Sequence, residues 1–201
     1  MQLATLPPIW FDLPVGTLLW RIYARGGTYP TTWNAFRTFG PLDARFDHHT
    51  HPKREQERGI MYLGRRGLTC FAEVFQRERI IDVHNGDPFL VAFRLSEPVR
   101  LLDLSGHWPT TVGASMAINS GSRRRAKVWS RAIYAAYPEA QGIWYCSAMD
   151  ANQPCVALYE RGQHALPPVS SFHAALADPR LRLFVDRVAT LLNYDVIPPR
   201  R

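Results

Sequence analysis

The feature that most constrains the fold is a series of short apolar segments separated by loops rich in glycine, proline and polar residues. The segments are enriched in β-branched and aromatic residues, several alternate apolar and polar positions, and we expect them to form strands. They lie at residues 17–25, 59–63, 79–83, 89–95, 98–103, 142–147 and 155–159. The turn Ser96-Glu97-Pro98 predicts that the fourth and fifth segments form a hairpin.

Helical periodicity occurs in fewer segments than the strand pattern does. After a turn at 64–67, Leu68, Phe71, Ala72 and Phe75 fall on one face of a short predicted helix. Further helices are predicted near 114–118, over 123–137 and over 178–193. In the helix over 123–137, Val128, Ala132, Ile133, Ala135 and Ala136 can face the core. The last helix has Asp178 as N-cap, with Leu181, Phe184, Val185, Val188, Leu191 and Leu192 facing the core.

The strands and helices together predict one α+β domain over residues 1–201, with its core at about 17–160. The chain has 201 residues, 46% of them hydrophobic, which is enough for one well-filled core and too little for two. Residues 1–16 are expected to be an extended lead-in, and residues 26–58 a long loop. The tail at 198–201 is expected to fray.

The formal net charge of +7 favours anionic partners but does not choose among nucleic acid, acidic proteins and phosphorylated small molecules. The strongest nucleic-acid signal is a basic cluster in the predicted helix over 123–137, made by Arg123, Arg124, Lys127 and Arg131. No helix-turn-helix, RNP pattern or zinc finger accompanies this cluster. We therefore expect a solvated helix face and no direct nucleic-acid binding.

Cysteine and histidine give no metal or disulfide signature. Cys70, Cys146 and Cys155 are odd in number and sit in apolar runs, which is typical of buried thiols in a reducing compartment. His48, His49 and His51 are too close together to ligate one ion easily, so we expect no metal site. The sequence has neither a signal peptide pattern nor an apolar segment long enough to span a bilayer, so we expect a cytoplasmic protein.

Several polar residues occupy segments that core packing should hold near the centre of the domain. Alternation over 17–25 places Arg21 and Tyr23 on one strand face, which predicts that this face borders a polar cleft; an ordinary solvated face is the alternative. Glu73 points away from the apolar face of its helix, as a solvated glutamate also would. Arg45 lies in the long loop, and Tyr145 and Ser147 share a face of the strand 142–147.

This set of side chains suits a nucleotide whose N-glycosidic bond is to be broken. Two guanidinium groups match the oxygens of a pyrophosphate, and a tyrosine ring, Tyr62 or Tyr23, can stack on a flat nitrogenous ring. A glutamate can bind a ribose hydroxyl or stabilise an oxocarbenium-like transition state. Ser147 adds a compact donor and acceptor.

From about Leu18 to Tyr159 the chain resembles the RES domain family, named for its Arg, Glu and Ser. The resemblance rests on the order and spacing of several motifs. They are Leu19-Trp20-Arg21-Ile22-Tyr23, a loop from Gly40 to Phe46, Tyr62-Leu63 leading to Ala72-Glu73, Gly142-Ile143-Trp144-Tyr145-Cys146-Ser147, and Cys155-Val156-Ala157-Leu158.

The resemblance implies a split, bent β core similar to that of ADP-ribosyltransferases and a toxin that degrades NAD⁺ at the nicotinamide–ribose bond. NAD⁺ would be the substrate, with inorganic phosphate as a possible co-substrate, and no resident cofactor is expected. The implied partner is an antitoxin with an Xre-type DNA-binding domain. The implied catalytic residues are Glu73, Arg21 and Ser147, with Glu73 as the main carboxylate. Arg21 and Arg45 would hold the phosphates, and Tyr23 and Tyr62 would border the nicotinamide ribose. Ser147 would position the ribose, and Tyr145 is counted among the substrate-binding residues.

Some questions stay open at this stage. The segment after Arg45 is longer and richer in histidine than the family pattern, so Arg25 or Arg37 are alternative phosphate ligands. Phosphorolysis and hydrolysis of NAD⁺ are both compatible with the sequence. Two other functions remain as alternatives: mono-ADP-ribosylation of a target protein, and a non-catalytic basic module that binds nucleic acid.

Overall fold

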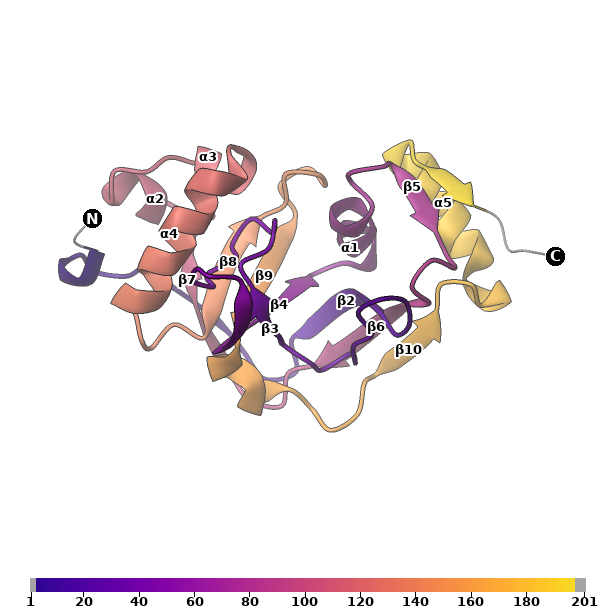
Figure 1. The fold of residues 1–201 in the computed structure, drawn as a ribbon, viewed down its shortest axis with the longest axis horizontal. Helices are drawn as coiled ribbons and strands as arrows, with labels where there is room; N and C mark the ends of the chain where they lie inside the picture. The colour runs from indigo at the N-terminus through magenta and orange to yellow at the C-terminus, as the bar shows by residue number, and fades with distance from the viewer. Residues whose placement is uncertain (1–2, 198–201) are drawn as a thin grey trace.

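A mixed β-sheet lies at the centre of the molecule (Figure 1). The computed structural model describes residues 3–197, and these contain one nine-stranded sheet of order β1-β7-β8-β9-β4-β2-β6-β10, with β3 paired to β4. Neighbouring strands are antiparallel except β7 and β8. The bounds are β1 Trp10–Leu13, β2 Leu18–Ala24, β3 Arg37–Gly40, β4 Arg54–Gly64, β6 Pro88–Arg94, β7 Val99–Asp103, β8 Gly142–Cys146, β9 Pro154–Tyr159 and β10 Phe172–Ala175. A second sheet pairs β5 (Ile80–Asp82) with β11 (Asp195–Ile197) in parallel.

The large sheet is nearly divided between β4 and β2. These two strands meet at a single register pair, Trp20 with Gly64, whereas β2 and β6 are paired from Leu18 to Ala24. The strands β4 and β9 are likewise paired from Ile60 to Gly64. The single contact makes the sheet a split one, and the predicted α+β fold with a split core is confirmed.

Helices cover the two halves of the sheet separately (Figure 1). Over the first half lie α2 (Trp108–Thr111), α3 (Ala117–Ser120) and α4 (Arg123–Ala136), packed on a cluster that includes Phe46, Trp108 and Ile143. Over the second half lie α1 (Gly67–Val74) and α5 (Arg182–Leu192), packed on a cluster that includes Phe71 and Leu90. Three 3₁₀ turns complete the fold, at Leu3–Thr5, Glu160–Ala165 and Pro179–Leu181.

All seven predicted strands are present, but one predicted pairing is wrong. The strands β6 and β7 do not form a hairpin, because β6 lies between β2 and β10 while β7 lies between β1 and β8. The backbone amides of the turn explain the difference: Leu95 donates to the carbonyl of Thr17, and Ser96 donates to that of Ala165. These bonds to other segments carry the chain away from β6 and into the other half of the sheet.

Several elements were not predicted. The expected loop over 26–58 contains β3 and the first residues of β4, which starts at Arg54 and not at Gly59. The expected lead-in contains β1, which pairs with β7. The strands β10 and β11 are short and lack strong alternation, so their sequences carry little signal. The short helix expected near 114–118 lies at Ala117–Ser120.

The core faces of two helices differ from the prediction. In α4 the buried residues are Ala126, Ser130 and Ile133, while Val128 is 47% exposed. In α5 Val185, Val188 and Ala189 are buried, and Leu191 is 64% exposed. A 3₁₀ turn precedes α5 and Asp178 accepts a hydrogen bond from the amide of Arg180, so the predicted N-cap residue caps that turn.

Two expectations concern the ends of the chain and the membrane. The tail at 198–201, predicted to fray, lies outside the described residues. Between residues 3 and 197, no helix is both long enough and apolar enough to cross a membrane.

Candidate functional site

The candidate site lies where α1 meets the loop between β8 and β9. Glu73 and Thr69 are four residues apart in α1 and so lie on one side of it. The hydroxyl of Ser147 donates to Oε1 of Glu73 at 2.6 Å. The hydroxyl of Thr69 donates to Oδ2 of Asp150 at 2.6 Å. Two side-chain hydrogen bonds therefore fix this helix to the loop that follows β8.

The proton of the Ser147 hydroxyl has a defined direction. Ser147 directly follows β8 and is buried, with 1% of its surface exposed. Its Oγ accepts hydrogen bonds from the backbone amides of Met149 (3.1 Å) and Asp150 (3.0 Å). Because these two donors occupy the acceptor positions of the hydroxyl, its proton points to Glu73.

The second oxygen of the Glu73 carboxylate is held by Gln76, one turn further along the chain. Nε2 of Gln76 donates to Oε2 of Glu73 at 3.2 Å and to the Glu73 carbonyl at 2.6 Å. Oε1 of Gln76 accepts from Nη2 of Arg123 at 3.0 Å. Arg123 begins α4, so this chain of hydrogen bonds links the helices over the two halves of the sheet.

Arg45 lies in the loop between β3 and β4 and reaches the residue that ends α3. It is half-buried, and its Nη1 donates to the carbonyl of Gly121 at 2.6 Å. Burial lowers the pKa of Arg45, as does the charge of Arg123, whereas Glu73 and two tyrosines, Tyr145 and Tyr62, act in the opposite direction. Arg45 therefore lies within electrostatic range of Glu73 and both rings.

The two alternative phosphate ligands are engaged elsewhere. Arg25 pairs with Asp87 at 2.9 Å on the surface. Arg37 pairs with the buried Asp47 at 3.0 Å and anchors the loop that carries Arg45. Of the three loop arginines considered from the sequence, Arg45 is the one whose pKa the charge of Glu73 acts to raise.

Tyr145 on β8 and Tyr62 on β4 lie on strands that both pair with β9. Burial raises the pKa of Tyr145 well above its usual value, and the charges of Cys155 and Glu73 add to the shift. Burial also raises the pKa of Tyr62. Both phenols are therefore neutral at physiological pH. The Tyr62 hydroxyl is buried and has no hydrogen-bond partner among the residues that the structure describes.

Arg21 has a different environment from the one expected. Its Nη1 donates to the carbonyls of Trp33 (2.7 Å) and Ala35 (2.9 Å), with a longer contact to that of Thr32 (3.4 Å). Burial lowers the pKa of Arg21 to about 10, so it remains a cation at neutral pH. In the described part of the chain, Arg21 makes no hydrogen bond to Glu73 or Ser147. Its observed contacts hold the 32–35 segment against β2.

The thiol of Cys70 connects Arg21 electrostatically with Glu73. Burial raises the pKa of this thiol to about 12; the charge of Glu73 acts in the same direction, and that of Arg21 opposes it. Arg21 and Glu73 are therefore both within electrostatic range of one buried sulfur, although no hydrogen bond joins them.

Tyr23 lies in another part of the core. Its hydroxyl is 2.6 Å from Nε2 of His173, and its ring packs against Phe89. It belongs to a small cluster with Phe89 and Val91, and within residues 3–197 it makes no hydrogen bond to Glu73. The family resemblance implied that Tyr23 borders the ribose; in the structure its side chain contacts Phe89 of β6 and His173 of β10, and the Arg21 guanidinium lies 5.9 Å from the centre of its ring.

The histidine-rich segment has a clear structural role. Nδ1 of His49 lies 2.6 Å from Oδ1 of Asp47, and its Nε2 lies 2.9 Å from the carbonyl of Arg58. The buried His48 stacks on Tyr134, and burial lowers its pKa to about 3, so this imidazole is neutral. Between residues 3 and 197 no group of three or more histidine, cysteine or carboxylate side chains is arranged to hold a metal ion.

A family model described as the RES domain matches residues 18–183. The chain belongs to the RES domain family. The structure is also similar to a chain in the crystal structure of the M. tuberculosis MbcT–MbcA toxin–antitoxin complex, with a TM-score of 0.51 and 13% identity. The match covers 81% of this chain and 85% of that one. At this identity the likeness is one of fold. No curated protein sequence matches this chain significantly.

The candidate site of this RES domain contains four residues that the sequence did not predict. Thr69 and Asp150 join α1 to the β8–β9 loop, while Gln76 bonds Glu73 and is itself bonded by Arg123. The spacing of Thr69 and Gln76 from Glu73, four and three residues, was a usable signal that the three side chains are neighbours on a helix. The bond to Arg123 depends on tertiary packing and had no sequence signal.

Proposed function

We propose that this RES domain is the toxin of a bacterial toxin–antitoxin pair and that it breaks the bond between nicotinamide and ribose in NAD⁺. Membership of the RES family supports the proposal at the level of the fold and the motifs. The geometry around Glu73 supports it at the level of chemistry.

The observation that carries the proposal is the 2.6 Å hydrogen bond from Ser147 to Glu73. It brings together two of the residue types after which the family is named, from segments 74 positions apart. The Ser147 and Gln76 bonds hold both carboxylate oxygens of Glu73 in place. A carboxylate held in this way needs little reorganisation when positive charge develops next to it.

In the proposed reaction, the bond between C1′ of the ribose and the nicotinamide nitrogen breaks, and its electron pair leaves with nicotinamide. The ribose ring acquires oxocarbenium character, which the negative charge of Glu73 stabilises. Water or inorganic phosphate then bonds to C1′ and loses a proton, giving ADP-ribose or its 1-phosphate ester. The tyrosines Tyr145 and Tyr62, both neutral, would border the ribose and the leaving ring.

The two arginines would have different roles in the site. Arg45 is half-buried and the charge of Glu73 acts to raise its pKa, so we assign it to the phosphates of the substrate. Nη1 of Arg21 is occupied by backbone carbonyls, which supports a role in shaping the site through the 32–35 segment.

The partner would be an antitoxin protein. The similar crystal structure is that of a toxin–antitoxin complex, formed by MbcT and MbcA, which supports a partner of this kind. The Xre type of the antitoxin is our own extension from the family resemblance.

The test is product identification with NAD⁺ labelled in the adenosine moiety, using purified protein with and without inorganic phosphate. If the enzyme hydrolyses NAD⁺, we expect labelled ADP-ribose without added phosphate. If it is a phosphorylase, we expect labelled phosphorylated ADP-ribose, formed only when phosphate is present. Label transferred to a protein would instead indicate mono-ADP-ribosylation. Unchanged NAD⁺ under both conditions would contradict the proposal.

A further inference from the structure

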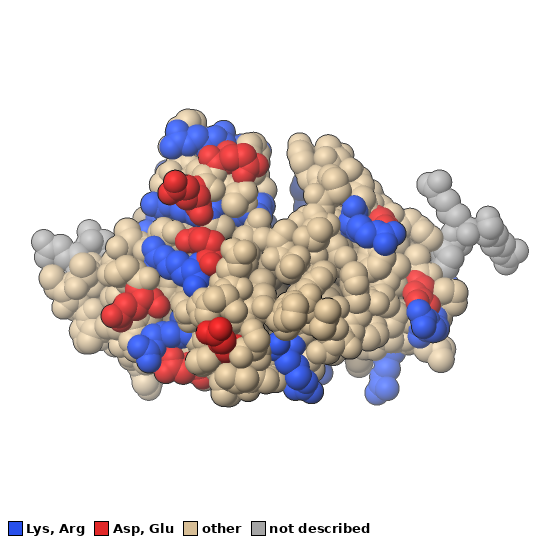
Figure 2. All heavy atoms as spheres, turned by 90° about the horizontal axis from the view of Figure 1, so that it is seen from below, with Lys and Arg blue, Asp and Glu red and all other residues tan. Residues whose placement is uncertain are grey.

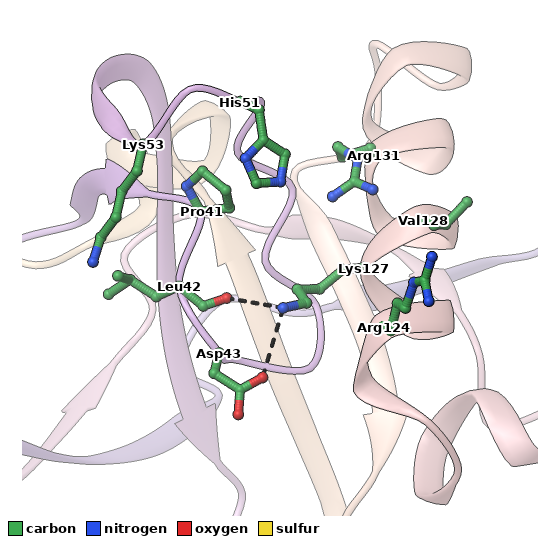
Figure 3. A pocket seen from close by; sticks show the side chains of 9 residues that line it. All are labelled: Pro41, Leu42, Asp43, His51, Lys53, Arg124, Lys127, Val128 and Arg131. Carbon is green, nitrogen blue, oxygen red and sulfur yellow. Dashed lines mark hydrogen bonds and ion pairs between the residues drawn. The ribbon is translucent and has the colours of Figure 1, made fainter.

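A basic groove lies between α4 and the loop that joins β3 to β4. It has a volume of about 500 Å³, and Pro41, Leu42, Asp43, His51 and Lys53 line one side of it. Arg124, Lys127, Val128 and Arg131 of α4 line the other side, and Figure 3 shows Lys127 and Arg131 directed toward the loop. The groove does not include Glu73 or Ser147, so it is separate from the candidate catalytic site.

The positive charge of the groove is only partly neutralised. Asp43 is its one carboxylate, and it lies 3.2 Å from Arg123 and 3.6 Å from Lys127. Within residues 3–197, neither Arg124 nor Arg131 has an acidic partner. The Lys53 ammonium lies over the Phe39 ring and has no acidic partner in the same range. Three cations of the groove are therefore available to an external anion.

The spacing of the α4 cations fits an extended chain. Arg124 and Arg131 are two turns apart on one face of α4, which is about 10 Å along the axis at 1.5 Å per residue. In the polyproline II conformation three residues make one turn and cover about 9 Å, so side chains three residues apart lie on the same side. A segment in this extended conformation with an acidic residue at every third position therefore places one carboxylate against each arginine.

The other lining residues favour a protein segment over nucleic acid. Pro41, Leu42 and Val128 give the groove an apolar part, and Val128 is 47% exposed. An unbroken line of phosphates would meet the Asp43 carboxylate, whereas a peptide can place an uncharged side chain there. The face in Figure 2 shows acidic and basic side chains interspersed, without the continuous basic stripe that tracks a nucleic-acid backbone.

We propose that this groove is a docking site for an extended acidic segment of a partner protein. The groove adjoins the catalytic site, because Arg123 contacts Asp43 on one side and Gln76 on the other. A carboxylate of the partner would compete with Asp43 for Lys127. The proposal does not depend on the reaction with NAD⁺.

The test is direct binding of a fluorescein-labelled peptide of about ten residues with glutamate at every third position and leucine and proline between, since proline favours the polyproline II conformation. We expect anisotropy to report binding at low salt that weakens as salt rises. The same peptide with glutamine in place of glutamate should not bind. The double variant R124E/R131E should lower the affinity at least about ten-fold. The matched control R77E/R187E changes the same charge at exposed positions outside the groove and should bind like wild type.

Two further variants keep the test decisive. If R124E/R131E does not fold, K53Q/R124Q removes two exposed cations of the groove without reversing charge. Asp43→Asn removes the competing carboxylate, so we expect the affinity to rise about three-fold. No binding by wild type, or equal loss in both double variants, would overturn the proposal. Binding of duplex or single-stranded DNA in place of the peptide, lost in R124E/R131E, would overturn it in favour of nucleic acid.

Discussion

At the scale of single residues, the central feature is a carboxylate whose two oxygens are each held by a neutral donor. Ser147 donates to one oxygen of Glu73 and Gln76 to the other. Neither donor brings a positive charge, so the negative charge of Glu73 remains available to a substrate. Arg45 lies close enough to act on the same ligand.

Ser147→Ala should lower kcat for nicotinamide release by roughly 10- to 100-fold. This factor corresponds to the free energy that a hydrogen bond to a charged group contributes. The substitution also leaves the amides of Met149 and Asp150 without their acceptor. We therefore expect a fall in the free energy of unfolding of about 1–3 kcal/mol, measured by urea denaturation. Ser171→Ala, at an exposed serine, is the control. Full activity of Ser147→Ala would show that the hydroxyl is not required.

Gln76→Ala tests whether Gln76 acts as a positioning residue. Without its amide the Glu73 carboxylate is free to rotate, and we expect kcat to fall roughly 3- to 10-fold with KM nearly unchanged. Steady-state kinetics separate this result from loss of substrate binding, in which KM would rise. Gln163→Ala changes an exposed glutamine and should leave both constants as in wild type.

The candidate site was predicted from the sequence only as far as local patterns and the family resemblance allow. Glu73 and Ser147 were predicted, and a hydrogen bond joins them; Arg45 was also predicted, and it bonds the Gly121 carbonyl two residues before Arg123. Tyr23 was placed in the site because alternation in β2 fixes only the strand face. It cannot fix how a split sheet bends, and the ring ends against His173. The hydrogen bonds from Arg123 to Gln76 and from Thr69 to Asp150 join segments far apart in the chain, which single-sequence patterns do not report.

At the scale of elements, the loop between β3 and β4 is held by a buried carboxylate. Asp47 is fully buried and contacts Arg37, His49 and the amide of Leu42. Burial alone would raise the pKa of Asp47. The hydrogen bonds from His49 and Leu42, with the charge of Arg37, outweigh this effect and hold the pKa well below its usual value. Asp47 thereby fixes the loop that carries Arg45.

Asp47→Asn should reduce the free energy of unfolding by about 3 kcal/mol at pH 7, because it leaves buried donors without a charged acceptor. A carboxylate with a lowered pKa in the folded state stabilises the protein above its unfolded pKa of about 4 and loses this effect as pH falls. The difference in the free energy of unfolding between wild type and Asp47→Asn should therefore become smaller as the pH falls from 5 to 2. Denaturant titrations at several pH values measure it. A difference that stays constant over that range would contradict this account of Asp47.

Elements with strong local patterns were predicted well, and those defined by distant partners were not. The strands β2, β8 and β9 have alternating or continuous apolar sequences, and each lies within one or two residues of its expected position. The supposed hairpin at 96–98 had an ordinary turn sequence, but its amides bond to Thr17 and Ala165. Its strands join different halves of the sheet, which no local sequence pattern specifies.

At the scale of the whole molecule, the split in the sheet is the main feature. One register pair joins β2 to β4, and each half has its own helices and its own cluster of buried side chains. The hydrogen bonds from Ser147 to Glu73 and from Arg123 to Gln76 cross between these halves. Motion between the halves would therefore change the candidate site directly.

Hydrogen exchange should report this division. Amides that bond β2 to β6 and β4 to β9 are in fully paired ladders, and we expect strong protection. Amides on the edges where β2 and β4 face one another should exchange at least about ten-fold faster, since little pairing holds them. Equal protection of these amides in β2, β4, β6 and β9 would contradict a weak junction between β2 and β4.

The most direct test of the central claim is the rate of nicotinamide release from NAD⁺ by purified Glu73→Gln, compared with wild type and Glu78→Gln. Glu78 is exposed five residues further along the chain, and its substitution removes the same charge outside the site. We predict that Glu73→Gln retains the folded structure and loses about 10²- to 10³-fold in kcat, while Glu78→Gln is unchanged. Equal rates in all three proteins, or no release by wild type, would contradict the claim that Glu73 is the catalytic carboxylate of an NAD⁺-cleaving enzyme.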